Sequence, residues 1–344
     1  MEFILIFFFV LIICTVIFYY FLFIKKDIPF IGTRDSEWAI GITYLSILNS
    51  NFLFNEPDQL QNPIITAEDT GFKDAQFVAD PFIFKYENNY YLFFEIMRSR
   101  KGVIGLAKRD YTHAWHFETI VLEEKFHLSY PSVFSINQRF YMLPETSQKK
   151  EIRIYSSKSF PYDWKFERIL LEGKEWFDPS IIQVNDFWYL FLALGNDTLE
   201  LYFSKNLLDG WKEHPKSPII VNNSSNARPA GMPMRVGTKL FRFAQDCRSR
   251  YGGAVRAFEI IQIDPENYTE QEIFNNPILT SSGKGWNGLG MHHLSFIGEN
   301  DGGFLAVTDG NRKLEQPIIF FLSYKLRISN FVHEKIMQIK KKGS

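Results

Sequence analysis

The chain has 344 residues, of which 46% are hydrophobic and 22% are charged, a balance typical of a globular protein with one large core or two smaller ones. Its formal net charge is −1, which argues against a nucleic-acid partner, because proteins that bind nucleic acid carry an excess of basic side chains. Aromatic residues make up 17% of the chain, which suits the packing of many β-sheets and also a sugar-facing surface.

The N-terminus predicts a membrane anchor over residues 1–26. Residues 3–24 contain no charged side chain and are long enough to cross a bilayer as one helix. A cleavable signal peptide has a shorter apolar core, with small residues before the cut. Lys25 and Lys26 follow directly, so the positive-inside rule favours a cytoplasmic location for the rest of the chain. A signal-anchor that places the domain in a lumen is the alternative.

A short motif then recurs five times along the chain. It reads DPFIF at Asp80, YPSVF at Tyr130, DPSII at Asp178, RPAGM at Arg228 and, in its weakest copy, HHLSF at His292. The copies are separated by 50, 48, 50 and 64 residues. A period near 50 residues with strand-like composition indicates an array or a propeller.

Further strands follow each copy at regular offsets. In the first three copies a second strand ends 15 residues after the motif, at Glu95, Glu145 and Ala193, and the last two copies have second strands that end at Asp246 and Asp309. A third strand, such as VIGLAK, and a fourth strand, such as TIVLEE or PILTSS, complete the units. Four short strands per unit are typical of a propeller blade, so we predict an all-β fold, a five-bladed β-propeller with four-stranded blades.

The ends of the ring are predicted to meet in the fifth blade. That blade has three strands after its motif, the last being PIIFFLSY, whereas a segment resembling a fourth strand, Asn62–Thr66, precedes the first blade. We therefore expect Asn62–Thr66 to supply the missing outer strand and to close the ring. The predicted propeller covers residues 62–326, after a linker of residues 27–61 with an added strand at 38–45. Residues 327–344 form a basic tail.

Propeller geometry predicts that polar side chains converge on one mouth of the central channel. The motif positions line the channel, and the antiparallel second strands end beside them. This set comprises Asp80, Glu95, Tyr130, Glu145, Asp178, Arg228, Asp246, His292 and Asp309. A concave cluster of this kind is the default hypothesis for a functional site.

Each of these residues also has a structural interpretation. An Asp before Pro can satisfy backbone donors of a turn, and Tyr130 can be a wall aromatic. Arg228 can neutralise the acids or bind an anionic ligand. His292 and His293 either face a cation or water on the axis or are buried and hydrogen-bonded. In the glycine-rich loop 283–290, Trp286 is a candidate ligand contact. The sequence has no Cys/His cluster or dinucleotide fingerprint, so we predict neither a metal nor a cofactor.

These motifs resemble two families. Asp-Pro motifs on the inner strands of a five-bladed propeller resemble the arabinanase, xylosidase and levansucrase superfamily of glycoside hydrolases. That resemblance implies that Asp80 is the base or nucleophile and that Asp178 orients the site. The superfamily keeps its acidic Glu on the inner strand of blade four in many members, but this chain has Arg228 there, which leaves Glu95 and Glu145 as candidate proton donors.

A closer resemblance covers nearly the whole predicted propeller. The strings FVADPF, FHLSYPSVF, LPETS, NARPAGMP, FRFAQDC, YGGAV and GMHH occur in order and resemble the N-terminal propeller domain of plant glucosamine inositolphosphorylceramide transferases. The resemblance implies a role in glycolipid or surface-glycan assembly and a location facing the Golgi lumen or the cell surface, against the Lys25–Lys26 prediction.

Three hypotheses of function follow. In the first, a single-pass membrane enzyme transfers or hydrolyses a glycosyl group of an anionic or phosphorylated glycan or glycolipid. In the second, the propeller is a glycan-binding module that assists a partner glycosyltransferase without catalysis. The third, a scaffold that binds proteins through its rim, has no need of a mouth ringed by acids.

Overall fold

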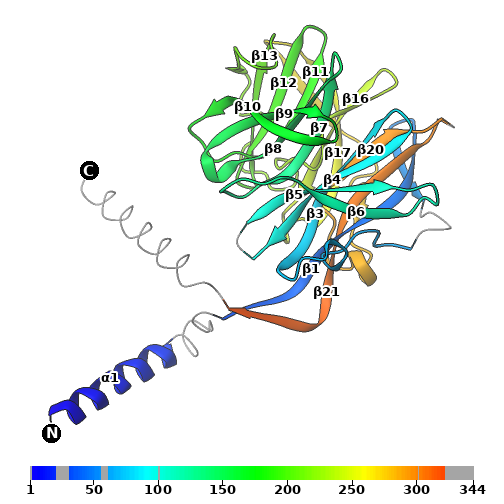
Figure 1. Ribbon diagram of the computed structural model, residues 1–344. Helices are drawn as coiled ribbons and strands as arrows, with labels where there is room; N and C mark the ends of the chain where they lie inside the picture. The colour runs from blue at the N-terminus through cyan, green and yellow to red at the C-terminus, as the bar shows by residue number, and fades with distance from the viewer. Residues whose placement is uncertain (1, 21–30, 56–60, 100, 301, 322–344) are drawn as a thin grey trace. The chain divides into compact units, whose positions relative to one another are not determined.

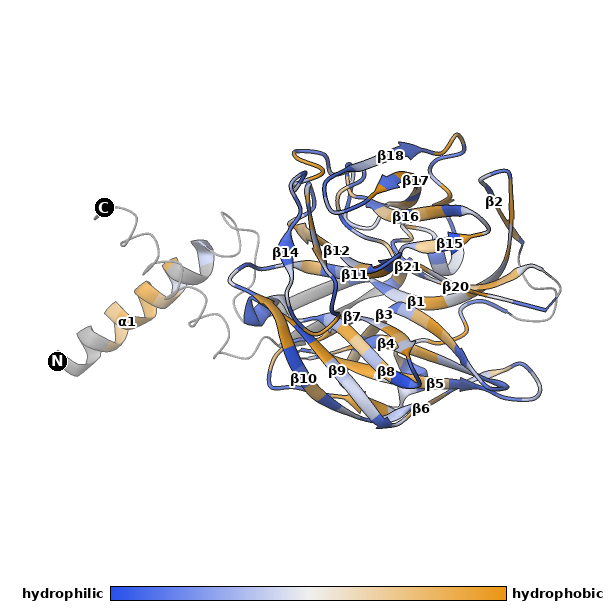
Figure 2. Cartoon of the chain, turned by 90° about the horizontal axis from the view of Figure 1, so that it is seen from above, coloured by the Kyte–Doolittle hydropathy of each residue, from blue (hydrophilic) through white to orange (hydrophobic). Residues whose placement is uncertain are grey.

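The computed structural model describes residues 2–20, 31–55, 61–99, 101–300 and 302–321. Residues Glu37–Arg312 form one compact unit, which is the propeller, and the helix α1 (Glu2–Tyr19) belongs to a separate unit. Helix α1 is strongly hydrophobic, as its colour in Figure 2 shows. Within the described residues, none of the helices combines the length and hydrophobicity needed to span a bilayer. Part of the predicted anchor, residues 21–26, and the predicted tail, 327–344, lie outside the described residues.

Five antiparallel sheets make up the propeller, which confirms the predicted all-β, five-bladed fold (Figure 1). Blade one contains β3 (Ala75–Tyr86), β4 (Asn89–Arg98), β5 (Gly102–Arg109) and β6 (Trp115–Leu122). Blade two contains β7 (Ser129–Ile136), β8 (Arg139–Glu145), β9 (Glu151–Ser159) and β10 (Tyr162–Glu172). Blade three contains β11 (Phe177–Val184), β12 (Phe187–Leu194), β13 (Thr198–Ser204) and β14 (Lys212–Glu213).

Blade four contains β15 (Met234–Val236), β16 (Lys239–Asp246), β17 (Ala254–Ile263) and β18 (Tyr268–Glu272), and β19 (Leu279–Thr280) also pairs with β17. Blade five contains β20 (Leu294–Gly298), β21 (Phe304–Phe321), β1 (Ile31–Leu48) and β2 (Asn51–Asn55). Single 3-10 turns occur at Glu68–Thr70, Ser147–Lys149 and Gly285–Asn287.

Blade five corrects the predicted domain boundaries. Residues 27–61 are predicted to be a linker with an added strand at 38–45, but β1 and β2 occupy the third and fourth places of this blade, so the propeller unit begins at Glu37. The predicted third strand, PIIFFLSY, is not a separate element, because its described residues simply continue β21. The N-terminal segment takes the third place because β1 pairs with β21 along one edge and with β2 along the other.

The segment Asn62–Thr66 lies alongside the final sheet, but it is not the outer strand. It forms one antiparallel bridge, Ile40 to Ile65, and the Asn62 side chain bonds both the N–H (2.8 Å) and the C=O (2.9 Å) of Ile42. Pro63 has no N–H to donate, which prevents a longer ladder at this point. The outer place belongs to β2. The ring is therefore closed by an N-terminal strand, as predicted, although by a different one.

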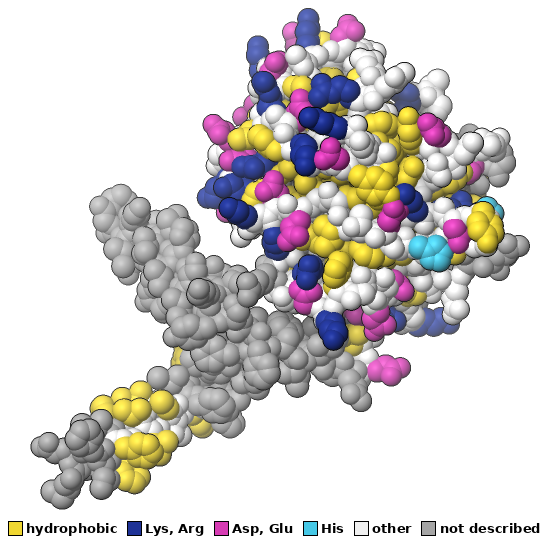
Figure 3. Space-filling view, in the orientation of Figure 1, with side chains coloured by type: hydrophobic (Ala, Val, Ile, Leu, Met, Phe, Trp, Pro, Cys, Tyr) yellow, Lys and Arg dark blue, Asp and Glu magenta, His cyan; other side chains and the backbone are white. Residues whose placement is uncertain are grey.

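Five apolar clusters lie between successive sheets and show how the ring closes. Phe93 of blade one packs with Met142 of blade two, and equivalent clusters join blades two and three, three and four, and four and five. The fifth cluster joins Leu305 of blade five to Leu92 of blade one. The strands carry the hydrophobic stretches that fill these interfaces (Figure 2). On the face shown in Figure 3, basic and acidic side chains are interspersed.

The inner strands of blades one to three share a local backbone distortion at the motif. Asp80, Tyr130 and Asp178 have positive φ angles of 52°, 49° and 49°, and the strand register shifts at each of these points. Residues other than glycine adopt this conformation rarely, and such strain is concentrated at functional sites. At Asp80 and Asp178 the bulge aims the motif side chain at the mouth of the channel.

Candidate active site

A pocket of about 230 Å³ opens at the mouth of the propeller. Six of the residues that the sequence nominated line it, and they come from all five blades. These residues are Asp80, Glu95, Glu145, Asp178, Arg228 and His292. Sequence positions more than two hundred residues apart therefore face one cavity, as the repeat predicted.

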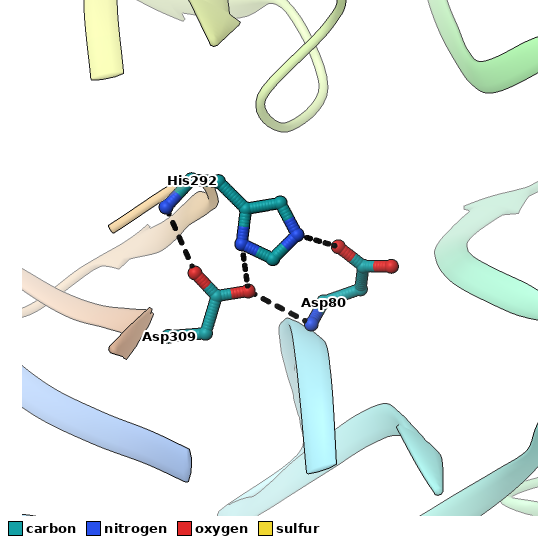
Figure 4. A group of neighbouring side chains, drawn as sticks. All are labelled: Asp80, His292 and Asp309. Carbon is teal, nitrogen blue, oxygen red and sulfur yellow. Dashed lines mark hydrogen bonds and ion pairs between the residues drawn. The ribbon is translucent and has the colours of Figure 1, made fainter. Parts of the chain in front are cut away.

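On the side of blades one and five, His292 bridges two carboxylates (Figure 4). Its Nδ1 lies 2.8 Å from Oδ2 of Asp309, and its Nε2 lies 3.3 Å from Oδ1 of Asp80. Burial opposes a charged imidazole, but the two carboxylates outweigh it and raise the pKa of His292 well above its ordinary value. Burial also opposes the charge on Asp80, yet His292 holds the pKa of Asp80 below its ordinary value. Asp80 is therefore ionised.

On the side of blades three and four, Arg228 grips the other Asp-Pro carboxylate. Its Nε donates to Oδ2 of Asp178 at 2.6 Å, and its Nη2 donates to Oδ1 at 3.4 Å. The guanidinium lies between the rings of Phe177 and Tyr251, 4.9 Å from each centroid. Burial raises the pKa of Asp178 to about 7 against the pull of Arg228, and the charges of Glu145 and Asp80 add to that rise. Of the two roles predicted for Arg228, the neutralising one is visible in this pairing.

Glu95 is buried and lies beside the imidazole ring of His127. Burial, followed by the negative charges of Asp80 and Glu145, raises the pKa of Glu95 well above its ordinary value. The N–H of Gly102 donates to Nδ1 of His127 at 2.8 Å, so the neutral imidazole carries its proton on Nε2. That nitrogen lies 3.5 Å from Oε1 of Glu95. Burial lowers the pKa of His127, which keeps its ring neutral beside Glu95.

Carboxylates of the site also accept backbone N–H groups from neighbouring blades. Asp309 accepts from Asp80 (3.1 Å), Asp80 accepts from Tyr130 (3.2 Å), and Glu145 accepts from Asp178 (3.2 Å). Each bond satisfies the N–H of a residue on an inner strand. Glu145 also accepts from the hydroxyl of Ser147 at 2.7 Å. These acids therefore satisfy backbone donors, as the structural interpretation expects, and Asp80 and Glu145 also line the pocket.

Five predicted site residues lie outside the lining of the pocket. Asp309 is buried beneath His292, and Trp286 packs close to Gly41 and Gly310, where an added Cβ would collide with its ring. The hydroxyl of Tyr130 bonds Ser180 (2.8 Å) and the N–H of Gly231 (2.6 Å) inside the channel.

His293 is fully buried and has no hydrogen bond to either ring nitrogen among the described residues. Its ring lies edge-on to Phe82 and Tyr130, with centroids 4.5 and 5.2 Å away. Burial lowers the pKa of His293 and favours a neutral ring. Asp246, the fifth residue, ion-pairs with Arg248 and Arg256 and lines a neighbouring groove.

The sequence did not point to several residues of the pocket lining, among them Trp38, His127 and Tyr251. Trp38 comes from the N-terminal strand β1, and its ring lies 4.2 Å from that of His292. His127 and Tyr251 precede β7 and β17. Both residues stood inside quoted strings, FHLSYPSVF and YGGAV, but the repeat drew attention only to motif and strand-end positions. Nothing in the sequence pointed to Trp38 as a pocket residue, because the strand predicted at 38–45 had no assigned place in the propeller.

The same structure brings one possible ligand set together. Atoms of Asp80, His292 and Asp309 lie within 4.8 Å of one another. However, both ring nitrogens of His292 face these carboxylates as ion pairs, and Asp309 also accepts the N–H groups of His292, His293 and Asp80. Both carboxylates therefore already have a cationic or N–H partner, which fits a charged histidine better than a metal ion.

The fold is similar to that of solved glycoside hydrolases. An α-L-arabinofuranosidase from Podospora anserina, solved with cellotriose, aligns over 73% of this chain and 96% of its own with a TM-score of 0.56 and 12% identity. The catalytic domain of an α-L-arabinofuranosidase from Coprinopsis cinerea aligns over 67% and 90% with a TM-score of 0.51 and 13% identity. At these identities the likeness concerns the fold.

The sequence comparison is more specific. The chain is 33% identical over 307 residues to glucosamine inositolphosphorylceramide transferase 1 of Oryza sativa subsp. japonica and 32% identical over 303 residues to that of Arabidopsis thaliana. These alignments cover 81% of this chain but only 40% and 39% of the relatives. The family model described as glucosamine inositolphosphorylceramide transferase 1, N-terminal, matches residues 49–311. The propeller with its acid-lined mouth therefore belongs to the family of the N-terminal domain of these transferases.

Proposed function

We propose that the propeller is a glycan-active enzyme that cleaves or transfers a glycosyl group of a glycolipid. The observation that supports this most is the separation of two carboxyl pKa values in one pocket. The pKa of Asp80 is lowered and that of Glu95 is raised. Pairs of titratable groups driven apart in this way are typical of acid and base partners in catalysis.

The roles follow from the charge states. Asp80 is ionised, so it serves as the base that takes the proton of an attacking hydroxyl, or as the nucleophile at the anomeric carbon. The raised pKa of Glu95 favours its protonated form, from which it delivers a proton to the leaving oxygen. Of the two proton donors considered from the sequence, Glu95 and Glu145, the raised pKa favours Glu95. Asp178, held by Arg228, orients the site, and Glu145 holds the N–H of Asp178.

The substrate class is inferred from the family. The relatives are named as transferases that act on inositolphosphorylceramide, and this chain spans about 40% of their length. An anionic glycolipid headgroup is therefore the proposed substrate. The uncharged residues 3–24 support a membrane-anchored location for the propeller, which would bring the pocket close to such lipids. The two indications of the side on which the propeller lies disagree. Lys25 and Lys26 favour the cytoplasm, whereas the family favours the lumen.

The decisive experiment separates the two carboxyl roles. The full chain, purified in detergent, is incubated with aryl glycosides that differ in leaving group. Glu95→Gln should lose about 100-fold or more on poor leaving groups and recover on 2,4-dinitrophenyl glycosides, which need no protonation. Asp80→Asn should lose activity on both. Full activity of Asp80→Asn with an unchanged fold would reject the proposed role.

The second candidate is a glycan-binding module without catalysis. Three acids of the site satisfy backbone N–H groups between blades, which gives them a purpose in the absence of a reaction. In that case calorimetry should detect binding of a glycan to the pocket, while prolonged incubation yields no product. A partner glycosyltransferase would then supply the chemistry.

A further inference from the structure

A second concavity lies next to the candidate active site, at the end of blade four. It has a volume of about 600 Å³ and differs from the catalytic pocket in its lining. Arginines, hydroxyls and glycine backbone dominate it, and its lining residues include Arg248, Ser249, Arg250, Thr280, Ser281 and Gly288. We call this concavity the arginine groove.

We propose that the arginine groove binds the phosphate of the substrate, a phosphate ester attached to the sugar that enters the neighbouring pocket. This proposal rests on the proposed function and identifies where the anionic part of the same substrate lies. The shared chemistry is a phosphate group, whether it belongs to a lipid headgroup or to a free phosphorylated sugar.

The first support is the balance of donors in the groove. Arg250 contacts only a carbonyl, donating from Nη1 to the oxygen of Leu289 at 3.0 Å, so its charge has no carboxylate partner among the described residues. The hydroxyls of Ser249, Thr280 and Ser281 form no hydrogen bond within the part of the chain that the structure describes. Arginine forks and hydroxyl donors match the geometry of phosphate oxygens.

The second support is the state of the one acid in the groove. Asp246 is held by Arg248 at 2.6 Å and by Arg256 at 3.3 Å. Two cations therefore neutralise this carboxylate, although Arg256 is shared with Glu272. Together with Arg250, the arginines outnumber the acids around the groove by three to two, which leaves a positive excess for an anion.

The third support is the loop that separates the two cavities. Arg250 lines the groove, and its neighbour Tyr251 lines the catalytic pocket and covers Arg228. One substrate can therefore reach both cavities around a single loop. Arg228 itself is occupied by Asp178, so the anionic group expected from the sequence needs another cation.

Calorimetry tests this proposal on the full chain in detergent with three probes: myo-inositol 1-phosphate, inorganic phosphate and uncharged myo-inositol. The phosphate-bearing probes should bind, and myo-inositol should bind much more weakly. Arg250→Ala should weaken phosphate binding about 10-fold or more, because it removes charge-assisted hydrogen bonds. Arg250→Lys should weaken it less. Arg235→Ala removes an exposed arginine from β15 and is the matched control.

The outcomes divide cleanly. Tighter binding of inositol phosphate than of inorganic phosphate points to a headgroup, and equal binding points to a free phosphate; both support the groove. No saturable phosphate binding, or an equal loss in Arg235→Ala, overturns it. Asp80→Asn should lose turnover and still bind phosphate. If Asp80→Asn loses turnover but neither the unchanged protein nor any variant binds phosphate, only the proposal for the groove is overturned. If the protein binds phosphate and Asp80→Asn keeps normal turnover, only the proposed function is overturned.

Discussion

The two Asp-Pro motifs share a sequence and a backbone but differ in their electrostatic surroundings. Asp80 and Asp178 both adopt a left-handed backbone conformation at a β-bulge, with φ of 52° and 49°. His292 holds one carboxylate and Arg228 the other. The pKa of Asp80 is lowered, whereas that of Asp178 is raised to about 7. The difference teaches that a local motif dictates where a carboxyl points, while partners from other blades dictate its charge.

The largest expected effect distinguishes the two carboxylates by activity. Asp80→Asn should lower turnover about 1,000-fold or more, because the base or nucleophile is removed. Asp178→Asn should lower it about 10- to 100-fold, because that residue only orients the site. Initial rates with one glycoside substrate measure both. Equal losses in the two variants would break the comparison.

The next effect concerns the stability of the Asp178 half. Arg228→Met should cost about 3 kcal/mol of unfolding free energy, because it leaves a buried carboxylate without its partner. The cost should grow as pH rises, since the unfolded state keeps an ionised Asp178 while the folded variant must hold a proton there. Denaturant unfolding at pH 6 and pH 8 measures this.

The double variant Asp178→Asn with Arg228→Met is the control for that measurement. It removes both charges and should be destabilised much less than Arg228→Met alone. A double variant as unstable as the single one would show that packing of Arg228 between its two rings, rather than the charge pair, supports this half.

The pH profile of activity sharpens the roles of Asp80 and Glu95. Activity requires an ionised Asp80 and a protonated Glu95. Lowering the pH through the depressed pKa of Asp80 should reduce activity, and raising it through the elevated pKa of Glu95 should also reduce it. The profile should be bell-shaped, and Glu95→Gln, assayed on an activated glycoside, should lose the alkaline limb. An alkaline limb that persists there assigns the acid elsewhere.

The smallest effect is a gain in stability at the active site. The folded-state pKa of Glu95 is raised, so its stabilising contribution is full at low pH and is lost as pH rises above the unfolded value. Glu95→Gln should therefore raise the melting temperature at pH 8 by about 2–4 °C. The gain should vanish near pH 4. Glu145→Gln, which alters an acceptor of the Asp178 N–H, should show no such gain.

The five-bladed fold and six residues of the pocket were predictable, because the sequence repeats the same motif at a period near 50 residues. Aligned motifs at Asp80, Tyr130 and Asp178 indicated repeated inner strands, and strand ends at Glu95 and Glu145 followed by antiparallel geometry. Segments outside the repeat could not be placed in the fold from the sequence. Trp38 and β1 lie outside the repeat, so neither the third strand of blade five nor its aromatic contact with His292 was foreseen.

Local rules in the residues decided that this chain makes five blades and that its motif side chains turn toward one channel. Hydrophobic alternation, turn residues and the repeat period act over short stretches, so they can be recognised without coordinates. The tertiary structure alone decided which N-terminal strand closes the ring, that Arg228 pairs with Asp178, and that the pKa of Glu95 is raised while that of Asp80 is lowered. The reason is physical: burial and the distances between charges depend on segments hundreds of residues apart, and no local pattern records them.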